Sequence, residues 1–285
     1  MQERVLNFLS LGLFRSLGRI FIGLAAVIEG IGARVLFLWQ VLVKVPARPF
    51  EVREFMLQLY LVGVRSLGIV AVSGFFVGGI VCSQFGYALG LFGAKLYLGG
   101  VTTSGLLREV GPVLVAVMIS GRIGAFIAAE MGTMKVTEQI DAVRCLGLDP
   151  VPVLVVPRFL AVLIMVFLLT IFGLLVSLVG GAATAYFMLD VNLRTYMGNL
   201  LRLTTVAAFL VGAVKSLLFG IIIATIACFE GYHASPGAEG VGRGVNRTLV
   251  YASIAVFLID YIVAAIVSIT FSLAQNIIFS IGVEL

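Results

Sequence analysis

Long apolar segments alternate along this chain with short polar ones, and the apolar segments set its architecture. Five of them are long enough to cross a bilayer as a helix, which needs about 20 residues. They cover approximately residues 57–83, 97–129, 157–188, 200–229 and 248–273. Lipid offers no hydrogen-bond partner, and a helix bonds its backbone groups within one segment. The pattern therefore predicts an all-α, polytopic membrane protein with about five transmembrane helices.

The first 55 residues are also apolar, but basic residues recur among them. Arg4, Arg15 and Arg19 fall within one narrow sector of a helix, which is typical of a helix lying in the headgroup region. Residues 20–43 are long enough to span, but crossing would place the basic residues that flank them on opposite sides, which the positive-inside tendency disfavours. We therefore expect an amphipathic, interfacial segment over 1–55. A transmembrane domain over 56–273 and a short tail over 274–285 follow it.

A polar stretch over residues 130–158 separates the second and third apolar segments. Within it, apolar residues recur at helical spacing and predict a short amphipathic helix over about 133–147. Thr137 and Glu138 suit the beginning of this helix, and Gly147 suits its end because glycine readily adopts the left-handed conformation. On the water side of a membrane, such a helix is either a solvated loop helix or a docking surface for a soluble partner. We favour the docking surface.

Charged residues occur inside the predicted spans. Arg108 and Glu109 lie in the second span, Lys215 near the middle of the fourth and Asp260 inside the fifth. A charge at that depth costs about 3 kcal/mol, so it usually faces a partner or a cavity. Pro112 removes a backbone hydrogen bond and predicts a kink beside the first two. Two interpretations stay open: ion pairs satisfied inside the bundle, with Lys215 bound to Asp260 or Glu109, or a polar edge of a transport path.

Composition and charge agree with a membrane location. The chain is 61% hydrophobic and 12% charged, about half the charged fraction of a soluble domain. The net charge of +5 fits basic residues on a cytoplasmic face better than nucleic-acid binding. Placing 1–55, 130–158 and a glycine-rich loop over 230–247 inside satisfies this tendency. It predicts a cytoplasmic amino terminus, a carboxyl terminus on the outer side of the membrane, and outer loops at 84–100 and 190–199.

Motifs for catalysis or for binding nucleotides and metals are scarce. Cys82, Cys145 and Cys228 are widely separated, which provides neither a disulfide framework nor a metal site. The single histidine, His233, cannot build a catalytic or metal cluster. No GxxxxGK[ST] phosphate loop occurs, so the chain has no nucleotide-binding motif of this kind.

Several short motifs, read in order, resemble the MlaE/YrbE permease family. They lie at 107–113 (LREVGPV), 121–124 (GRIG), 129–132 (AEMG), 137–142 (TEQIDA), 146–150 (LGLDP) and 157–158 (PR). The resemblance continues at 215–216, 231–232, 242–243 and Asp260, and covers about residues 50–273.

The resemblance implies a non-catalytic permease subunit of an ABC transporter, one that moves phospholipids between a bacterial inner membrane and the cell envelope. Such permeases work as a pair of copies with two separate ATPase subunits, which bind ATP and magnesium. A ring of MCE-domain substrate-binding proteins lies on the outer side. In that arrangement the helix over 133–147 is the coupling helix seated in the ATPase, and the lipid cavity lies between the two permease copies. The chain itself would hold no cofactor.

Two sets of residues are the site candidates. The ATPase-coupling set supplies charged contacts and flexible ends for the coupling helix: Glu130, Gly132, Lys135, Glu138, Asp141, Arg144 and Gly147. The lipid-path set supplies apolar walls and charges for a headgroup: Phe75, Phe76, Val81, Phe85, Arg108, Glu109 and Lys215.

Two other classes of function were weighed. A secondary transporter or ion pathway would use Glu109, Lys215 and Asp260 as a relay, would need no ATPase and would usually show inverted repeats, which the chain does not display. An intramembrane enzyme would need a nucleophile with a base or a set of metal ligands, and neither HExxH nor GxSxG occurs.

Overall fold

The structure is a computed structural model. It describes the backbone of residues 2–46 and 50–280, and the side chains of residues 22–272 except those at 24, 47–49, 201 and 203. Every regular element of these residues is helical, and six helices among them are long and apolar enough to cross a membrane. The predicted fold class, an all-α polytopic membrane protein, is therefore confirmed. The chain divides into two compact units, Met1–Ala47 and Arg48–Leu285.

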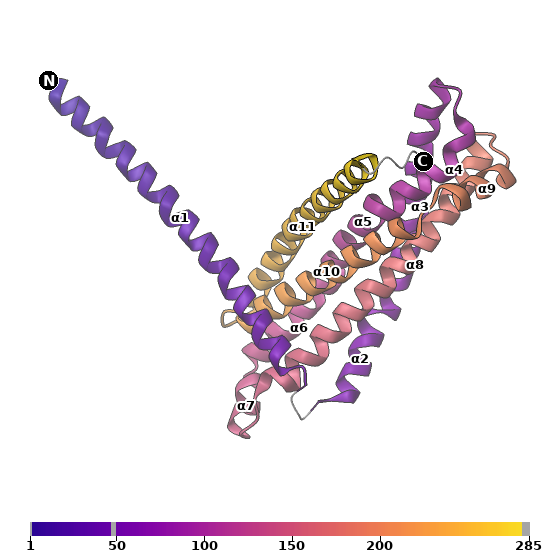
Figure 1. The fold of residues 1–285 in the computed structure, drawn as a ribbon. Helices are drawn as coiled ribbons and strands as arrows, with labels where there is room; N and C mark the ends of the chain where they lie inside the picture. Colours follow the sequence, from indigo (N-terminus) through magenta and orange to yellow (C-terminus); the bar gives the residue numbers. More distant parts are fainter. Residues whose placement is uncertain (1, 47–49, 281–285) are drawn as a thin grey trace. The chain divides into compact units, whose positions relative to one another are not determined.

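The first unit is a single long helix, α1 (Gln2–Lys44), drawn in indigo in Figure 1. Its part Ala25–Lys44 has the length and hydropathy of a membrane span, which adds a sixth candidate to the five expected from the sequence. The predicted basic stripe of Arg4, Arg15 and Arg19 lies outside the described side chains. An interfacial position for this segment stays a prediction.

The second unit is a bundle of five helical crossings (Figure 1). The first consists of α2 (Val52–Val62), η1 (Val64–Ser66) and α3 (Leu67–Leu91). The second consists of η2 (Lys95–Tyr97), α4 (Leu98–Gly105), η3 (Leu106–Val110), α5 (Gly111–Ile119), η4 (Ser120–Gly124) and α6 (Ala125–Val136). The others are η5 (Val151–Val155) with α8 (Val156–Met188), α10 (Val206–Tyr232) and α11 (Ala238–Ser280). Two short helices, α7 (Gln139–Cys145) and α9 (Leu193–Leu203), lie at opposite ends of the bundle, called here the α7 end and the α9 end.

The closest helix packing joins α3 to α8. Gly74 and Gly78 have the GxxxG spacing that allows a second helix to approach closely. A Cβ atom placed on Gly78 would lie 1.8 Å from the Ser177 carbonyl oxygen, and one placed on Gly180 would lie 2.0 Å from the Phe75 carbonyl oxygen. The two backbones are therefore in direct contact, and glycine is required because no larger residue fits there.

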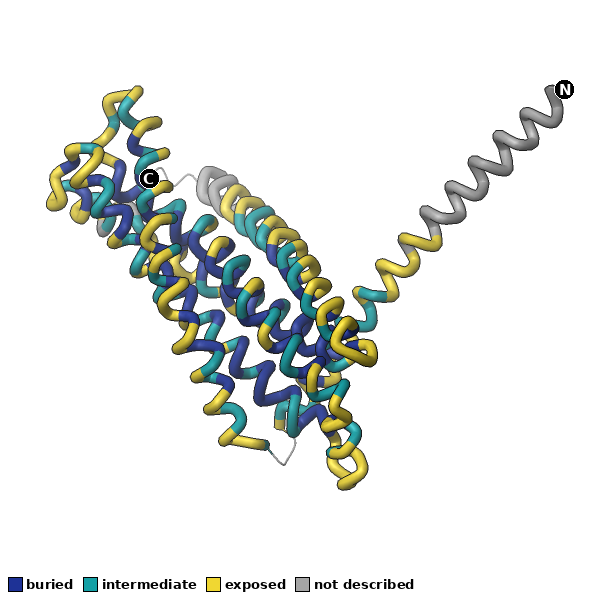
Figure 2. The backbone as a smooth tube through the Cα atoms, turned by 180° about the vertical axis from the view of Figure 1, so that it is seen from behind, coloured by how far each residue is buried: buried dark blue, intermediate teal, exposed yellow. Residues whose placement is uncertain are grey.

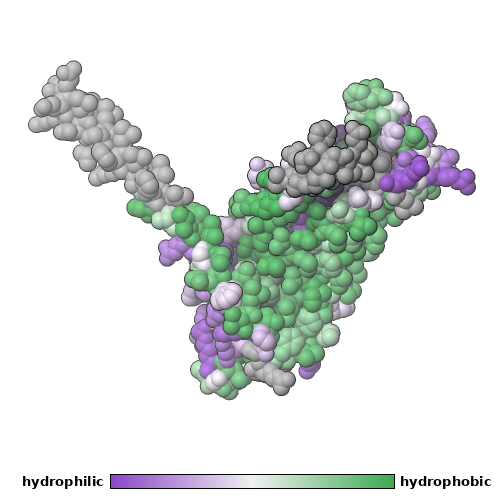
Figure 3. Space-filling view, in the orientation of Figure 1, coloured by the Kyte–Doolittle hydropathy of each residue, from purple (hydrophilic) through white to green (hydrophobic). Residues whose placement is uncertain are grey.

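The sides of the bundle are apolar and its ends are polar. Figure 3 shows a continuous hydrophobic surface along the helices, with hydrophilic residues gathered towards the two ends. Large apolar side chains such as Phe76 and Tyr261 are mostly exposed, and Figure 2 shows the buried residues on the inward faces of the helices. An exposed apolar surface of this extent fits contact with lipid or with a partner chain.

Three π-helical turns interrupt the crossings at η3, η4 and η5. Two of them directly precede a proline: η3 ends two residues before Pro112, and η5 ends two residues before Pro157. Proline has no N–H to donate to the carbonyl four residues earlier, and a wider turn accommodates that loss. The break expected at Pro112 thus takes the form of a π turn, and this turn carries Arg108 and Glu109.

The loops expected at 84–100 and 190–199 are wrong. In the structure α3 continues to Leu91, helical structure resumes at Lys95, and α9 begins at Leu193. A Cβ atom on Gly99 would lie 2.1 Å from the Tyr196 carbonyl oxygen, so this glycine serves the close contact of α4 with α9. Because α9 takes up residues to 203, the fourth crossing begins at Val206 and not near 200.

The glycine-rich loop expected at 230–247 is also mostly helical. Only residues 233–237 between α10 and α11 are non-helical. A Cβ atom on Gly240 would lie 2.0 Å from the Ser235 carbonyl oxygen, and one on Gly244 would lie 3.3 Å from that of Glu230. These glycines therefore allow α11 to begin close against the end of α10.

Candidate functional site

The predicted coupling helix is observed as a sharp break followed by one short helix. α6 ends at Val136, Glu138 adopts φ 60°, and α7 covers Gln139–Cys145. A positive φ is uncommon for a residue other than glycine and marks a tight reversal of the chain. We refer to residues 137–149 as the elbow.

The elbow helix ends where the sequence predicts but does not begin at Thr137. Thr137 does not begin it: its hydroxyl donates to the Thr133 carbonyl oxygen at 2.8 Å within the preceding helix, and no side chain caps α7. The end is as expected, since Gly147 has φ 77° and takes the left-handed conformation.

Three charged side chains and one tyrosine hold the elbow to the bundle. Lys135 Nζ lies 2.9 Å from Asp141 Oδ2, and Arg144 Nη1 lies 2.9 Å from Asp141 Oδ1. Arg144 Nη2 also donates to the Tyr232 hydroxyl at 2.7 Å, which links α7 to the end of α10. The hydrogen bond from Lys135, with the nearby charge of Arg144, lowers the pKa of the Asp141 carboxyl below its ordinary value. Asp141 thus links Lys135 at the end of α6 to Arg144 on α7.

The outward face of the elbow combines charge with exposed apolar surface. Ile140 is fully buried and anchors α7, whereas Glu138 is exposed. Leu146 is 77% exposed and Leu148 is 41% exposed, on either side of Gly147. A protruding helix with exposed leucines beside carboxylates is suited to packing against a soluble protein.

Glu130 and Gly132, expected at the coupling surface, face the interior of the bundle. Arg158, only 1% exposed, lies 2.8 Å from Glu130 and 2.7 Å from Glu54, and Gln58 donates to Glu130 at 3.0 Å. We refer to Glu54, Gln58, Glu130 and Arg158 as the Arg158 cluster, which joins α2, α6 and α8 near the α7 end. Gly132 lies inside α6, where a Cβ atom would meet Val241 at 3.2 Å, so it serves close packing and not a bend.

The charges inside the membrane-crossing helices form a second cluster. Lys215 is fully buried, and its Nζ lies 2.5 Å from Glu109 Oε2 and 2.8 Å from Asp260 Oδ1. Lys215 and Asp260 are close enough to form an ion pair, but the angles between them are not those of a hydrogen bond. The lysine thus bridges η3, α10 and α11, and both carboxylates that the sequence offered as partners are used together. We refer to these three residues as the Lys215 cluster.

The cluster has one open side. The Glu109 side chain is 48% exposed although its partner Lys215 is fully buried. The neighbouring Arg108 guanidinium lies 5.7 Å from the Phe271 ring centroid on α11. A carboxylate and a guanidinium therefore sit side by side next to a buried cation at the surface of the bundle.

The apolar members of the lipid-path set lie elsewhere on the bundle. Phe75 and Phe76 on α3 form an edge-to-face pair with centroids 5.8 Å apart, and Phe76 is 63% exposed. Val81 is half-buried, and Phe85 packs against the core between α3 and α4. All four residues belong to α3, whereas the Lys215 cluster consists of residues of η3, α10 and α11.

Sequence reasoning did not identify Glu54 and Gln58. Their spacing of four residues on α2 was a signal that they share one helix face, but Glu130 lies 72 residues beyond Gln58. Tyr232 was noted within a motif, and only the structure brings its hydroxyl to Arg144.

Comparison with known proteins gives a consistent picture. Residues 55–266 match the family model described as "Permease MlaE". A "Probable ABC transporter permease protein" of Rickettsia typhi is 34% identical over 235 residues, which cover 82% of this chain and 91% of that protein. A protein of the same description from Synechocystis is 36% identical over 209 residues, 73% of this chain and 80% of that protein. The "Intermembrane phospholipid transport system permease protein MlaE" of Haemophilus influenzae is 33% identical over 210 residues, again 73% and 80%.

Proposed function

Because the chain belongs to the MlaE permease family of ABC transporters, we propose that it moves phospholipids between a bacterial inner membrane and the cell envelope. The printed name of the Haemophilus influenzae relative, at 33% identity, supports this substrate class. We further propose that it acts as a pair of copies with two ATPase subunits and a ring of MCE-domain proteins. The amino terminus and the elbow face the cytoplasm in this proposal, and the carboxyl terminus faces the periplasm.

The observation that carries the proposal is the elbow. The chain has no phosphate-binding loop, so ATP and magnesium belong to the partner ATPase. The elbow is a short helix held at one end of the bundle, with Glu138, Leu146 and Leu148 exposed. These features are suited to a groove of a soluble partner whose closure pushes the elbow.

The Arg158 cluster supplies a route from the elbow into the membrane. Arg158 on α8 contacts Glu130 on α6 and Glu54 on α2, and α6 leads directly to the elbow. A displacement of α6 therefore acts on two further crossings through buried ion pairs, which are costly to break singly. In this role Glu130 transmits motion and does not contact the ATPase itself.

The Lys215 cluster is the proposed headgroup site. Arg108, Glu109 and Lys215 present both signs of charge at depth in the membrane, and a phospholipid headgroup carries a phosphate that a cation can bind. Phe75, Phe76, Val81 and Phe85 are the proposed apolar walls. The proposed path is completed between two copies of the chain, which brings distant parts of each copy together.

An ion relay through Glu109, Lys215 and Asp260 is the alternative. The three residues do lie in contact, which a relay requires. Membership of an ABC permease family favours a partner ATPase as the energy source, so the lipid-transport proposal stands first.

The test is ATP-driven lipid transfer in vesicles that contain the chain together with its co-purified ATPase and MCE-domain partners. We expect Glu138→Lys and Asp141→Arg each to slow transfer about tenfold, equivalent to ~1.4 kcal/mol, while the complex still hydrolyses ATP. Glu239→Lys is the control, because Glu239 is 83% exposed and belongs to α11 outside the elbow. Normal transfer in both elbow variants would refute the coupling role, and transfer without any ATPase would refute the proposed energy source.

A further inference from the structure

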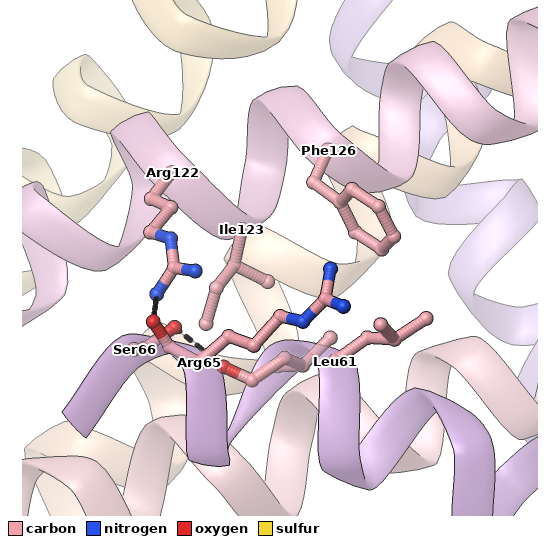
Figure 4. Close-up of a pocket in the computed structure, with 7 residues that line it drawn as sticks. Leu61, Arg65, Ser66, Arg122, Ile123 and Phe126 are labelled. Atoms are coloured by element: carbon pink, nitrogen blue, oxygen red, sulfur yellow. Dashed lines mark hydrogen bonds between the residues drawn. The ribbon is translucent and has the colours of Figure 1, made fainter.

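A hollow lies between the first and second crossings and is distinct from both clusters described above. It measures about 80 Å³ and lies between η1 and α2 on one side and η4 and α6 on the other. Figure 4 shows Arg65 extending across it towards Leu61 and Phe126, with Arg122 above the Arg65–Ser66 turn. A single water needs about 10–15 Å³ of such space, so the hollow admits a group larger than a water.

The hollow holds two cations without a carboxylate. Arg122 Nη1 donates to the Arg65 carbonyl oxygen, which uses one of the five N–H groups of its guanidinium. The Arg65 guanidinium lies 6.0 Å from the Tyr60 ring centroid. Within the part of the chain that the structure describes, neither arginine has a carboxylate oxygen within 4.0 Å, in contrast with Arg158 and Lys215.

Both arginines lie between the middle and the α7 end of their crossings. Their crossings, Val52–Leu91 and Lys95–Val136, are 40 and 42 residues long. Each arginine lies six to seven residues from the midpoint of its crossing towards the α7 end, which is about 10 Å at 1.5 Å per residue. Half of a typical hydrocarbon core is about 15 Å, so in a crossing centred on the bilayer the backbone of each arginine lies inside the core and its side chain can reach the headgroups.

Two arginines that line one hollow, with no carboxylate among its lining residues, call for an anion from outside the described chain. Each charge costs about 3 kcal/mol on insertion scales where it lies in the hydrocarbon layer. The π turn η4 places Arg122 in the hollow, and such turns occur frequently at functional sites. Arginine is the side chain best suited to phosphate, because its planar fork forms two parallel hydrogen bonds.

We propose that Arg65 and Arg122 bind the phosphate of a phospholipid in the leaflet at the α7 end. The acyl chains would lie along the apolar side chains of Leu61 and Phe126, and the Phe126 side chain is 38% exposed. The site goes beyond the proposed transport activity, because it lies towards the opposite end of the bundle from the Lys215 cluster and retains lipid whether or not the chain moves it. Inorganic phosphate shares the same chemistry and is the other source to be distinguished.

Native mass spectrometry of the full-length chain, delipidated in mild detergent and in complex with its partners, tests the site. Three probes are added separately: dioleoyl phosphatidylglycerol, dioleoylglycerol without the phosphate, and inorganic phosphate. We expect phosphatidylglycerol to bind the wild type about tenfold more tightly than the Arg65→Gln/Arg122→Gln variant, and dioleoylglycerol to bind both equally weakly. Arg194→Gln is the matched control, because Arg194 is an exposed arginine at the α9 end.

Each outcome is decisive. Equal binding of phosphatidylglycerol to the wild type and the double variant, or equal binding of dioleoylglycerol and phosphatidylglycerol to the wild type, would overturn the proposal. Inorganic phosphate that binds as tightly as the lipid and is lost in the double variant would overturn the lipid source. Arg122→Lys keeps the positive charge but lacks the planar guanidinium that forms two parallel hydrogen bonds. We expect its affinity for phosphatidylglycerol to lie between those of the wild type and the double variant, and this variant replaces the double variant if the latter does not fold. Wild-type lipid binding without ATP-driven transfer would contradict the proposed function and leave this site intact.

Discussion

Replacing Gly78 with alanine tests whether the backbone contact between α3 and α8 sets the spacing of the bundle. The added Cβ would lie 1.8 Å from the Ser177 carbonyl oxygen, whereas ordinary contact begins at 3.4 Å. The shortfall is about 1.6 Å, and the obstacle is backbone and not a flexible side chain. Overpacking a tight interior costs about 1–3 kcal/mol, so we expect a loss at the upper end of that range, ~3 kcal/mol.

Gly68 provides a matched control on the same helix. No atom lies within 4 Å of a Cβ placed there, so Gly68→Ala adds the same methyl group without the clash. Alanine in place of glycine gains roughly 0.5–1 kcal/mol in a helix interior, and less at Gly68 because it lies in the first turn of α3. The two variants are therefore expected to shift stability in opposite directions.

The measurement is denaturant titration in mixed micelles, followed by circular dichroism of the purified chain. Gly78→Ala should unfold at a lower denaturant fraction than the wild type, and Gly68→Ala at the same or a higher one. Equal midpoints for Gly78→Ala and the wild type would refute direct backbone packing of α3 on α8. A loss in Gly68→Ala as large as that in Gly78→Ala would show that the effect comes from glycine itself and not from the contact.

Two further predictions concern the buried charge clusters. Lys215→Met leaves Glu109 and Asp260 without their cation, and breaking a buried ion pair costs ~3–5 kcal/mol. We therefore expect ATP-driven lipid transfer to fall about tenfold or more. Unchanged transfer and unchanged lipid cross-linking would limit Lys215 to a structural role. Arg158→Met should lower the free energy of unfolding, measured in the same titration, by a comparable amount. Adding Glu130→Gln to this variant should recover part of that loss. No recovery in the double variant would mean that the ion pair is not the source of the loss.

The apolar pattern was sufficient for the helical crossings but not for their ends. Each predicted span lies mostly within an observed crossing, because a run of more than 20 apolar residues has no alternative to helix in lipid. The ends were misjudged at 84–100, 190–199 and 230–247, where loops were expected and helices are observed. Gly99 and Gly240 are helical because each allows a close backbone contact, and that contact depends on residues far away or on the following turn.

The candidate sites were predictable to different degrees. Pairing of Lys215 with Asp260 or Glu109 was one of two interpretations left open, and the structure places both carboxylates beside it. The inward position of Glu130 could not be foreseen, because its partner Arg158 is 28 residues away and approaches only after the chain reverses at Glu138. The hollow at Arg65 and Arg122 likewise depends on residues 57 positions apart.

The π turns have a consequence for the helical phase of the second crossing. An α-helix advances by about 100° per residue, and a π turn absorbs one residue more than a regular turn. If η4 relaxed to α geometry, everything beyond it would rotate by about 100°, and Glu130 would swing away from Arg158. The direction of the elbow thus depends on the number of residues in η4. Deleting one residue from η4 would convert it to a regular turn and keep that direction, whereas deleting one residue from the regular helix α5 would turn the elbow by about 100°.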